Sequence, residues 1–556
     1  MLNLNSESMK KRIVYIISLA LGLCSCSLEE HPTSFPTRDN FYNTPSQCRA
    51  ALDGCYLPLN KIYTANYILV TEACTDLWHS GSTTTDACLD VSPAKPQFGA
   101  KVWEYGYQGV MFCNECIECI GSSPIDEQHK LAMVAEAVTL RALYYYNLTC
   151  MFGGVPFYTC MVKDRAVADS ISTLSRTEPS VIRRELYKDL KDNALPYSQQ
   201  LDREHAGYPL ALMLMAKMAL WEEAWDDALY ALDLLEELYG EFSEERYPLE
   251  QCRWRYKNTA ESIFEIQHWW SFNGVQFPGN VANILTPPNA ASADDPSQRL
   301  YDGVSLPELG NEASSWNSLV ANNHFGIFRP KKGTAKEEQA VSHAIFKALP
   351  LTFDDEFNEP DGRWYTRLDT DAVRSGSIRG KKIDRRVLEI FGLGNLESGE
   401  TFQTTRRYGT GWGGPRFWCP DLVLSNDSNN YKIFRYADAL LMKAECLLAL
   451  GELQGAVDYI NLIRKRAGVD LFDYSMSAED LQKELRDERA RELGGEFQRK
   501  FDLVRWGIWY EETVLYNTNS KIKDRIKPYH RYYPIPQTQC ALSHGALTND
   551  EYIENE

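Results

Sequence analysis

Three evenly spaced cysteines are the first residues in this sequence whose types and spacing could do chemistry. Cys113, Cys116 and Cys119 form a CxxCxxC pattern, and cysteines at short spacing can hold an iron–sulfur cluster or zinc. No fourth ligand follows at a suitable spacing, and Ile120 stands where a ferredoxin-type run would continue. The same spacing puts all three thiols on one side of a helix, where cysteine behaves as a small apolar residue. We therefore predict a core helix here.

Two glycine-containing stretches imitate nucleotide-binding motifs. Gly409, Gly411 and Gly414 satisfy GxGxxG, but Trp412 lies inside the pattern and Pro415 follows it, so the required strand-to-helix context is missing. The GSIRGKK run of residues 376–382 lacks the spacing and the hydroxyl residue of a P-loop. The sequence also contains no HxxxH, HExxH or GxSxG arrangement. We interpret residues 409–414 as an aromatic loop.

One acidic cluster could hold calcium or lie on both sides of a glycosidic bond: Asp354, Asp355, Glu356, Glu359 and Asp361. Its spacing matches neither an EF-hand loop nor an assignable acid–base pair. We expect a solvated loop, and no motif supports a calcium ion or any other cofactor. A surface-anchored glycosidase that uses this cluster is kept as an alternative function.

The aromatic content is the clearest compositional sign of function. The chain has 13 Trp and 31 Tyr, and sugar rings present C–H faces that stack on such side chains. Tryptophans on helical stripes are expected in the core, whereas those in predicted loops or strands are candidates for ligand contact. Partner contacts and local packing use tryptophan too. The ligand-binding candidates are Trp78, Trp269, Trp270, Trp316, Trp364 and Trp412.

The N-terminus predicts a lipoprotein signal. A basic Lys10-Lys11-Arg12 segment precedes an apolar run at 13–23, which is too short to span a membrane. The run ends in Leu-Cys-Ser-Cys, and the surroundings of Cys26 resemble a bacterial lipobox better than those of Cys24. We expect removal of residues 1–25 and acylation of Cys26, so that lipid alone anchors the chain to the membrane.

The net charge excludes one class of partner, and the cysteine count bears on the disulfides. The chain of 556 residues has a formal charge of −19, and loss of residues 1–25 brings it to about −21 by the same counting. A surplus of acid opposes phosphate binding, so nucleic acid is excluded as a partner. Thirteen cysteines remain beside Cys24 and Cys26. This odd number argues against a full disulfide framework, and the pairing stays open.

Helical hairpins must position these residues. Residues 434–507 contain apolar stripes with helical spacing, broken at Gly451 and stopped at Gly468, which is the pattern of a tetratricopeptide-type hairpin. Residues 46–240 repeat it, with a loop-like part at 71–107. We predict a mainly α, tetratricopeptide-like scaffold with a loop-rich, aromatic-rich insertion that carries short β segments. The expected divisions of the compact unit 26–556 are 26–250, 251–433 and 434–556, after the signal at 1–25.

Several segments, in this order, resemble the SusD/RagB family of outer-membrane nutrient-binding lipoproteins. Two departures are Phe497, where the family usually has glycine, and residues 543–547, which replace an Asn-Pro-rich ending. The matching segments are Cys26 with LEEHP at 28–32, ALDGCY at 51–56, EAVTLRALYYY at 136–146, FGGVP at 152–156, RYAD at 435–438, NLIRKRAG at 461–468, the charged residues from Arg486 to Arg505 that precede WG at 506–507, and PIP at 534–536.

The resemblance implies a binding protein without catalytic activity. It also implies a SusC-like TonB-dependent transporter as partner, an outer-membrane location facing the cell exterior, and oligosaccharide as ligand. Some members take peptides, so a RagB-like peptide-binding lipoprotein is a second alternative. The charged residues between Arg486 and Arg505 are then expected to form structural ion pairs. Which glycan or peptide is bound is not determined by the sequence.

Overall fold

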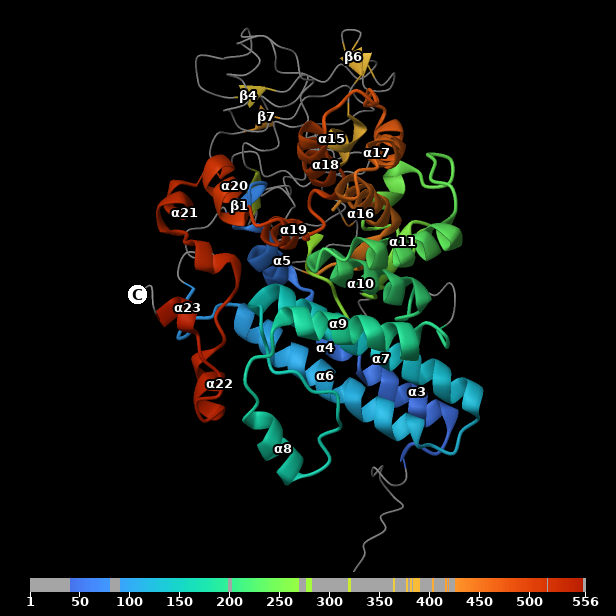
Figure 1. Cartoon of the computed structure of the whole chain (residues 1–556), viewed down its shortest axis with the longest axis vertical. Coiled ribbons are helices and arrows are strands. Elements are labelled where there is room, and N and C mark those ends of the chain that lie inside the picture. The colour runs from blue at the N-terminus through green and yellow to red at the C-terminus, as the bar shows by residue number, and fades with distance from the viewer. Residues whose placement is uncertain are drawn as a thin grey trace, which may run out of the picture.

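Helices dominate the computed structural model, which describes residues 41–80, 91–198, 203–269, 277–282, 426–517 and 519–553, with short pieces between 319 and 419. They stack in layers, with the first long helices at one end and the later ones above them (Figure 1). The predicted mainly α fold class is confirmed. Among the described residues, no helix is long and apolar enough to cross a membrane.

The first layer consists of α3 (Pro45–Gly54), α4 (Leu57–Ile62), α5 (Ala65–Glu72), α6 (Gly99–Gly121) and α7 (Glu127–Phe152). A capping box of Thr44 and Gln47, with Pro45 in the first turn, starts α3. Asp126 caps α7 by accepting from the backbone N–H of His129 at 3.1 Å. From Ala137 onward every residue of α7 is buried, so this helix is the axis of the core.

Helix α6 corrects the prediction that residues 71–107 are loop-like. It already begins at Gly99 and carries Trp103 against Phe152, with ring centroids 5.1 Å apart. Glycines on this helix allow it to pack closely against α7. A Cβ on Gly109 would lie 2.1 Å from the ring of Tyr144 on α7, so any larger residue would push the two helices apart.

The next helices extend the layers: α8 (Arg165–Ser172), α9 (Pro179–Asp189) with the π-helical turn η1 (Leu190–Ala194), α10 (Tyr208–Trp221) and α11 (Trp225–Tyr239). Helix α10 is buried from Pro209 to Leu220, because α7, α9, α11 and α16 (Tyr436–Ala449) all pack against it. Helix α11 packs directly on α16. Helical segments that lie about 200 residues apart in the sequence therefore form one continuous stack (Figure 1).

The chain re-enters the stack through a two-stranded antiparallel sheet of β2 (Ser262–Ile266) and β8 (Tyr431–Arg435). Both strands are fully buried, so neither shows the alternation of a half-exposed strand. Helices α16, α17 (Leu453–Ala467) and α18 (Ala478–Leu493) follow. Further described elements are η2 (Leu249–Cys252), β1 (Trp78–Ser80), β3 (Leu319–Ala321), β4 (Trp364–Tyr365), β5 (Ser377–Ile378), β6 (Lys381–Lys382), α15 (Arg385–Ile390) and β7 (Gln403–Thr404).

The C-terminal part wraps back to the first layer. It contains α19 (Arg499–Arg505), α20 (Trp509–Tyr516), α21 (Ser520–Arg525), η11 (Pro528–Arg531), α22 (Gln537–Leu542) and α23 (Asp550–Ile553). A small apolar cluster joins Leu503, Trp509 and Ile522 to Cys74, which is disulfide-bonded. The indole N–H of Trp509 donates to the Cys74 carbonyl at 2.8 Å.

Charged residues from Arg486 onward form buried ion pairs, as the family resemblance implies. Arg489 pairs with Asp502 at 2.8 Å, and Arg505 pairs with Glu445 at 2.5 Å. Deeper still, Glu492 of α18 contacts Arg435 at 2.7 Å and Arg466 at 2.5 Å. Burial opposes ionisation of Glu492, but these arginines outweigh it and hold the pKa of the carboxyl well below its usual value. The cluster is structural, since its members satisfy one another inside the core.

Candidate functional site

An exposed aromatic pair lies where β2 ends. Trp269 and Phe277 exchange two backbone hydrogen bonds, each 2.9 Å from nitrogen to oxygen. Residues paired in this way stand directly opposite each other with their side chains on one face. Trp269 is 59% exposed and Phe277 is 44% exposed, although large aromatic side chains are usually buried. The two rings thus give the surface a flat apolar patch, which we call the Trp269–Phe277 platform.

A network of side-chain amides supports the Trp269 side of the platform. The side chains of Asn258 and Gln267 exchange hydrogen bonds of 3.1 and 3.0 Å. The amide of Asn430 donates to Gln267 at 2.9 Å and to Glu265 at 2.9 Å, while its carbonyl oxygen accepts from the backbone N–H of His268 at 2.9 Å. Such a saturated network fixes the strand that carries Trp269, so the ring needs little ordering when a ligand binds.

Two ionisable groups beneath the platform have fixed charge states. His268 is buried, which lowers its pKa to about 4, and its Nδ1 donates to the Phe277 carbonyl at 3.2 Å. Its imidazole is therefore neutral at pH 7. Burial opposes ionisation of Glu265, but Lys432 at 2.8 Å outweighs it and lowers the pKa of that carboxyl. The platform thus keeps the same support across the physiological pH range.

The strand that carries Phe277 is held from two sides. Gly279 exchanges backbone hydrogen bonds of 2.8 and 3.0 Å with Asp427. A Cβ at Gly279 would lie 2.8 Å from the Asp427 side chain and 3.0 Å from the Asn429 carbonyl, so the close approach requires glycine. The side-chain oxygen of Asn280 accepts from the backbone N–H of Ala65, at the start of α5, at 2.8 Å.

A third exposed ring lies on the neighbouring turn. Tyr256 is 40% exposed, and the guanidinium of Arg255 stands 5.2 Å from its ring centroid. The adjacent Lys257 donates to the His268 carbonyl at 2.7 Å, which ties this turn to the residue before Trp269. Aromatic faces beside the charged side chain of Arg255 suit a ligand with C–H faces and polar groups. Sequence reasoning missed Phe277 and Tyr256, because the exposure of both rings follows from the folded structure and not from a local pattern.

The structure corrects one sequence-predicted site residue. Trp78 begins β1 and is fully buried in the main core, so its ring cannot stack on a ligand from solvent. Its polar neighbours Thr75 and Asp76 suggested a loop, but these residues are buried as well. Trp364 lies in β4, and its side chain is outside the description. Outside the described residues lie Trp270, Trp316 and Trp412, the acidic cluster of 354–361 and the lipid-anchor candidate Cys26.

Neither cysteine-containing candidate has the surroundings of a metal centre. Cys113 and Cys116 are buried on α6 and Cys119 is half-buried, in agreement with the predicted core helix. Within the described residues, ligand atoms of Cys252, Glu261 and Glu492 do lie close enough to share an ion. However, Arg466 contacts Glu261 at 2.7 Å and Glu492 at 2.5 Å, so the protein's own guanidinium groups already neutralise these carboxylates.

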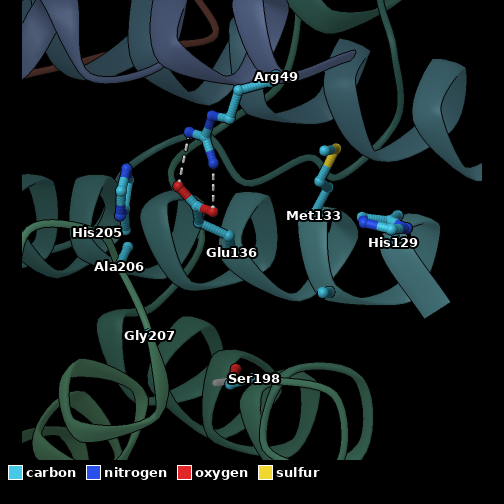
Figure 2. A pocket seen from close by; sticks show the side chains of 9 residues that line it. Arg49, His129, Met133, Glu136, Ser198, His205, Ala206 and Gly207 are labelled. Carbon is cyan, nitrogen blue, oxygen red and sulfur yellow. Dashed lines mark hydrogen bonds and ion pairs between the residues drawn. The ribbon is translucent and has the colours of Figure 1, made fainter. Parts of the chain in front are cut away.

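A cavity of about 240 Å³ lies between α3, α7 and residues 198–207, as Figure 2 shows. Arg49 reaches across it and makes two hydrogen bonds, of 2.8 and 2.9 Å, with Glu136. Tyr56 also donates to Glu136, and the backbone N–H of Ala206 donates to Tyr56 at 2.8 Å. Arg49 and Glu136 therefore satisfy each other, and the rest of the lining mixes small or apolar residues with His129, Ser198 and His205. The Trp269–Phe277 platform remains the better binding surface.

Comparison with known proteins places this geometry in context. The SusD family model matches residues 423–552, and a SusD-like model described as "Starch-binding associating with outer membrane" matches residues 59–200. SusD-like protein P25 of Formosa agariphila is 25% identical, over 97% of this chain and 98% of its own.

Solved structures agree on the fold. A laminarin-binding SusD-like protein has a TM-score of 0.63 at 20% identity, over 91% of this chain and 98% of its own. Surface glycan-binding protein A from Bacteroides thetaiotaomicron, in complex with laminarihexaose, has a TM-score of 0.62 at 18% identity, over 91% and 99%.

The stacked helical hairpins form a tetratricopeptide-like scaffold that presents an exposed aromatic platform near the end of a buried strand. The two family models match opposite ends of the chain, and P25 aligns over nearly all of it. The chain is therefore similar to SusD-like proteins along nearly its whole length.

Proposed function

We propose that this protein captures oligosaccharides at the cell surface, with the Trp269–Phe277 platform as a stacking site, and delivers them to a TonB-dependent outer-membrane transporter. The observation that carries the proposal is the exposure of two opposed aromatic rings on a backbone held from both sides. A pre-formed, rigid apolar face reduces the entropy lost when a flexible ligand binds. The glycan ligands named for the two structural neighbours support the same class of ligand.

Calorimetric titration of the whole chain with a panel of oligosaccharides and peptides tests the proposal. Binding of at least one oligosaccharide, weakened about tenfold or more by Trp269→Ala, is the expected result; that factor corresponds to about 1.4 kcal/mol of lost contact free energy. Tyr474→Ala is the matched control, because Tyr474 is 58% exposed on the turn between α17 and α18. An equal loss of affinity in Trp269→Ala and Tyr474→Ala would show that the platform is not the stacking site.

The same panel separates the alternatives. Binding of peptides alone would favour the RagB-like peptide-binding lipoprotein over a glycan-binding one. Shortened products after long incubation with a bound glycan would favour a glycosidase, and variants of Asp354 and Glu356 would then locate the activity. If neither an oligosaccharide nor a peptide binds, the proposal that the protein captures nutrients is wrong.

Anchoring and delivery are further parts of the proposal. The lipobox-like sequence at Cys26 supports a lipid-anchored, exterior-facing protein, and the outer-membrane association described for the SusD-like family model is consistent with it. Labelled palmitate should enter the wild-type chain but not Cys26→Ala. Protease added to intact cells should remove the wild-type protein from the surface. Co-purification with a large β-barrel protein would support the transporter, whereas recovery of the chain by itself from mildly solubilised membranes would count against it.

A further inference from the structure

Two buried thiols from different helices meet in the first layer. Cys55 follows the last turn of α3, Cys116 lies in the C-terminal part of α6, and their Sγ atoms are 3.5 Å apart. Both residues are almost completely buried, at 0% and 2% exposure. We propose that Cys55 and Cys116 are joined by a disulfide in the mature protein, which clamps the end of α3 to α6.

Three observations carry this inference. The sulfur atoms need to approach by only about 1.5 Å to reach the bond length of about 2.05 Å, and rotation about the Cα–Cβ bonds of two cysteines supplies such a movement. Cys74 is disulfide-bonded, so the chain belongs in a compartment where protein thiols become oxidised. The third observation is the charge of the surroundings. Tyr42 and the carbonyl of Ala51 are the polar groups that contact the two thiols, and the charged groups that act on them are the carboxylates of Glu136 and Glu115. Negative charge disfavours a thiolate, so these surroundings do not favour a metal-binding thiolate.

The chemistry fixes when the bond forms. The thiolate of one cysteine attacks a disulfide-bearing oxidant and releases one oxidant sulfur as a thiolate, which leaves a mixed disulfide. The second cysteine thiolate then attacks the cysteine sulfur of that mixed disulfide and releases the other oxidant sulfur. Two electrons and the two protons of Cys55 and Cys116 thus pass to the oxidant, which leaves as two thiols. In the folded chain the neighbouring thiols and burial raise the pKa of both groups, so thiolate is scarce there. Oxidation therefore precedes closure of α3 on α6, and the finished bond is out of reach of small thiols. It is a structural bond, and it closes a loop of 60 residues.

Peptide mapping of the full chain, purified without reductant and alkylated in denaturant, tests the proposal. Trypsin gives one peptide at 50–61 that contains Cys55 and another at 102–130 that contains Cys113, Cys116 and Cys119. We expect these two peptides as one cross-linked species that separates on reduction. Both peptides fully alkylated before reduction would overturn the proposal.

Single substitutions identify the partner within 102–130. In Cys116→Ser, Cys55 should become alkylated, whereas Cys113→Ser should keep the cross-link unchanged. A link that persists in Cys116→Ser would overturn the assignment to Cys116. The Tm gives a second readout that needs no digestion: Cys55→Ala and Cys116→Ala should each lower it by several degrees, and the double variant should lower it no further, because either change already opens the loop. Additive losses would contradict a bond between these two residues.

Discussion

Lys217 on α10 forms an ion pair of 2.6 Å with Asp438 on α16, and both side chains are more than nine-tenths buried. These residues stand on opposite sides of the long insertion, so the pair links the two halves of the helical stack. Arg489 contacts the same carboxylate at 2.9 Å. Burial opposes ionisation of Asp438, but Lys217 and Arg489 outweigh it and lower the pKa of the carboxyl.

Removal of Asp438 should destabilise the whole stack. Asp438→Ala leaves the Lys217 ammonium buried without its carboxylate, and such changes cost about 3–5 kcal/mol. Denaturant unfolding measures the loss. The double variant Lys217→Met/Asp438→Leu should recover most of it, since neither charge remains. Glu104→Ala, which breaks only the exposed Lys101–Glu104 pair, should leave stability nearly unchanged. A loss no larger for Asp438→Ala than for this control would refute the linking role.

Lys500→Met should stabilise the protein, and more at low pH. Lys500 contacts the rings of Trp509 and Tyr533 and donates to the His530 carbonyl, and its burial lowers its pKa from 10.5 to about 7. Between pH 7 and pH 10.5 the unfolded chain binds more protons than the folded chain. The free-energy cost of burying the charged ammonium is therefore complete below pH 7 and declines as the pH rises to 10.5.

The pH difference is measurable by denaturant unfolding. The gain in free energy of unfolding from Lys500→Met should be about 2–3 kcal/mol larger at pH 6 than at pH 9, to order of magnitude. Lys521→Met, an exposed lysine on α21, is the matched control and should show no such trend. A gain that is independent of pH would mean that Lys500 keeps an ordinary pKa.

Glu72→Gln should show the opposite trend. Burial raises the pKa of Glu72 from 4.5 to about 8, although one oxygen accepts from the backbone N–H of Arg499 at 3.2 Å. The folded chain then binds more protons between pH 4.5 and 8, so the stability of the wild type falls as the pH rises through this window. The neutral amide removes that fall, and the variant should gain about 2–3 kcal/mol more at pH 9 than at pH 6. Parallel unfolding curves at both pH values would contradict it.

Gly279→Ala should weaken ligand binding without touching a ligand-facing side chain. Its Cβ would press on Asp427 and the Asn429 carbonyl, so the strand that carries Phe277 must move. We expect titration to show that any oligosaccharide that stacks on Trp269 binds several-fold more weakly to this variant. Gly54→Ala is the control, because a Cβ there meets nothing within 4 Å, and it should leave affinity unchanged. Unchanged affinity in Gly279→Ala would show that the platform tolerates movement.

The backbone conformation of Phe497 is a feature that sequence patterns could not predict. Phe497 adopts a left-handed φ of 63°, a backbone conformation that residues other than glycine rarely adopt. Its side chain is fully buried among Trp254, Phe417 and Tyr431. Burial of a whole phenylalanine outweighs backbone strain of about 1–2 kcal/mol. A pattern of residue types cannot show this balance, because the compensating contacts come from three distant segments.

The helical scaffold follows from the order of residue types alone, because apolar residues at helical spacing must be covered by other helices. The spacing of Cys113 and Cys116 also predicts their position in the core, whereas the structural role of the charged residues between Arg486 and Arg505 was implied only by the family resemblance. Only the tertiary structure decided which aromatic rings face solvent: Trp78 is buried and Trp269 is exposed, although both follow polar or strand-like stretches. The reason is physical. Exposure of a loop or strand residue depends on which distant segment pairs with it, and here Phe277 opposes Trp269 while the core encloses Trp78.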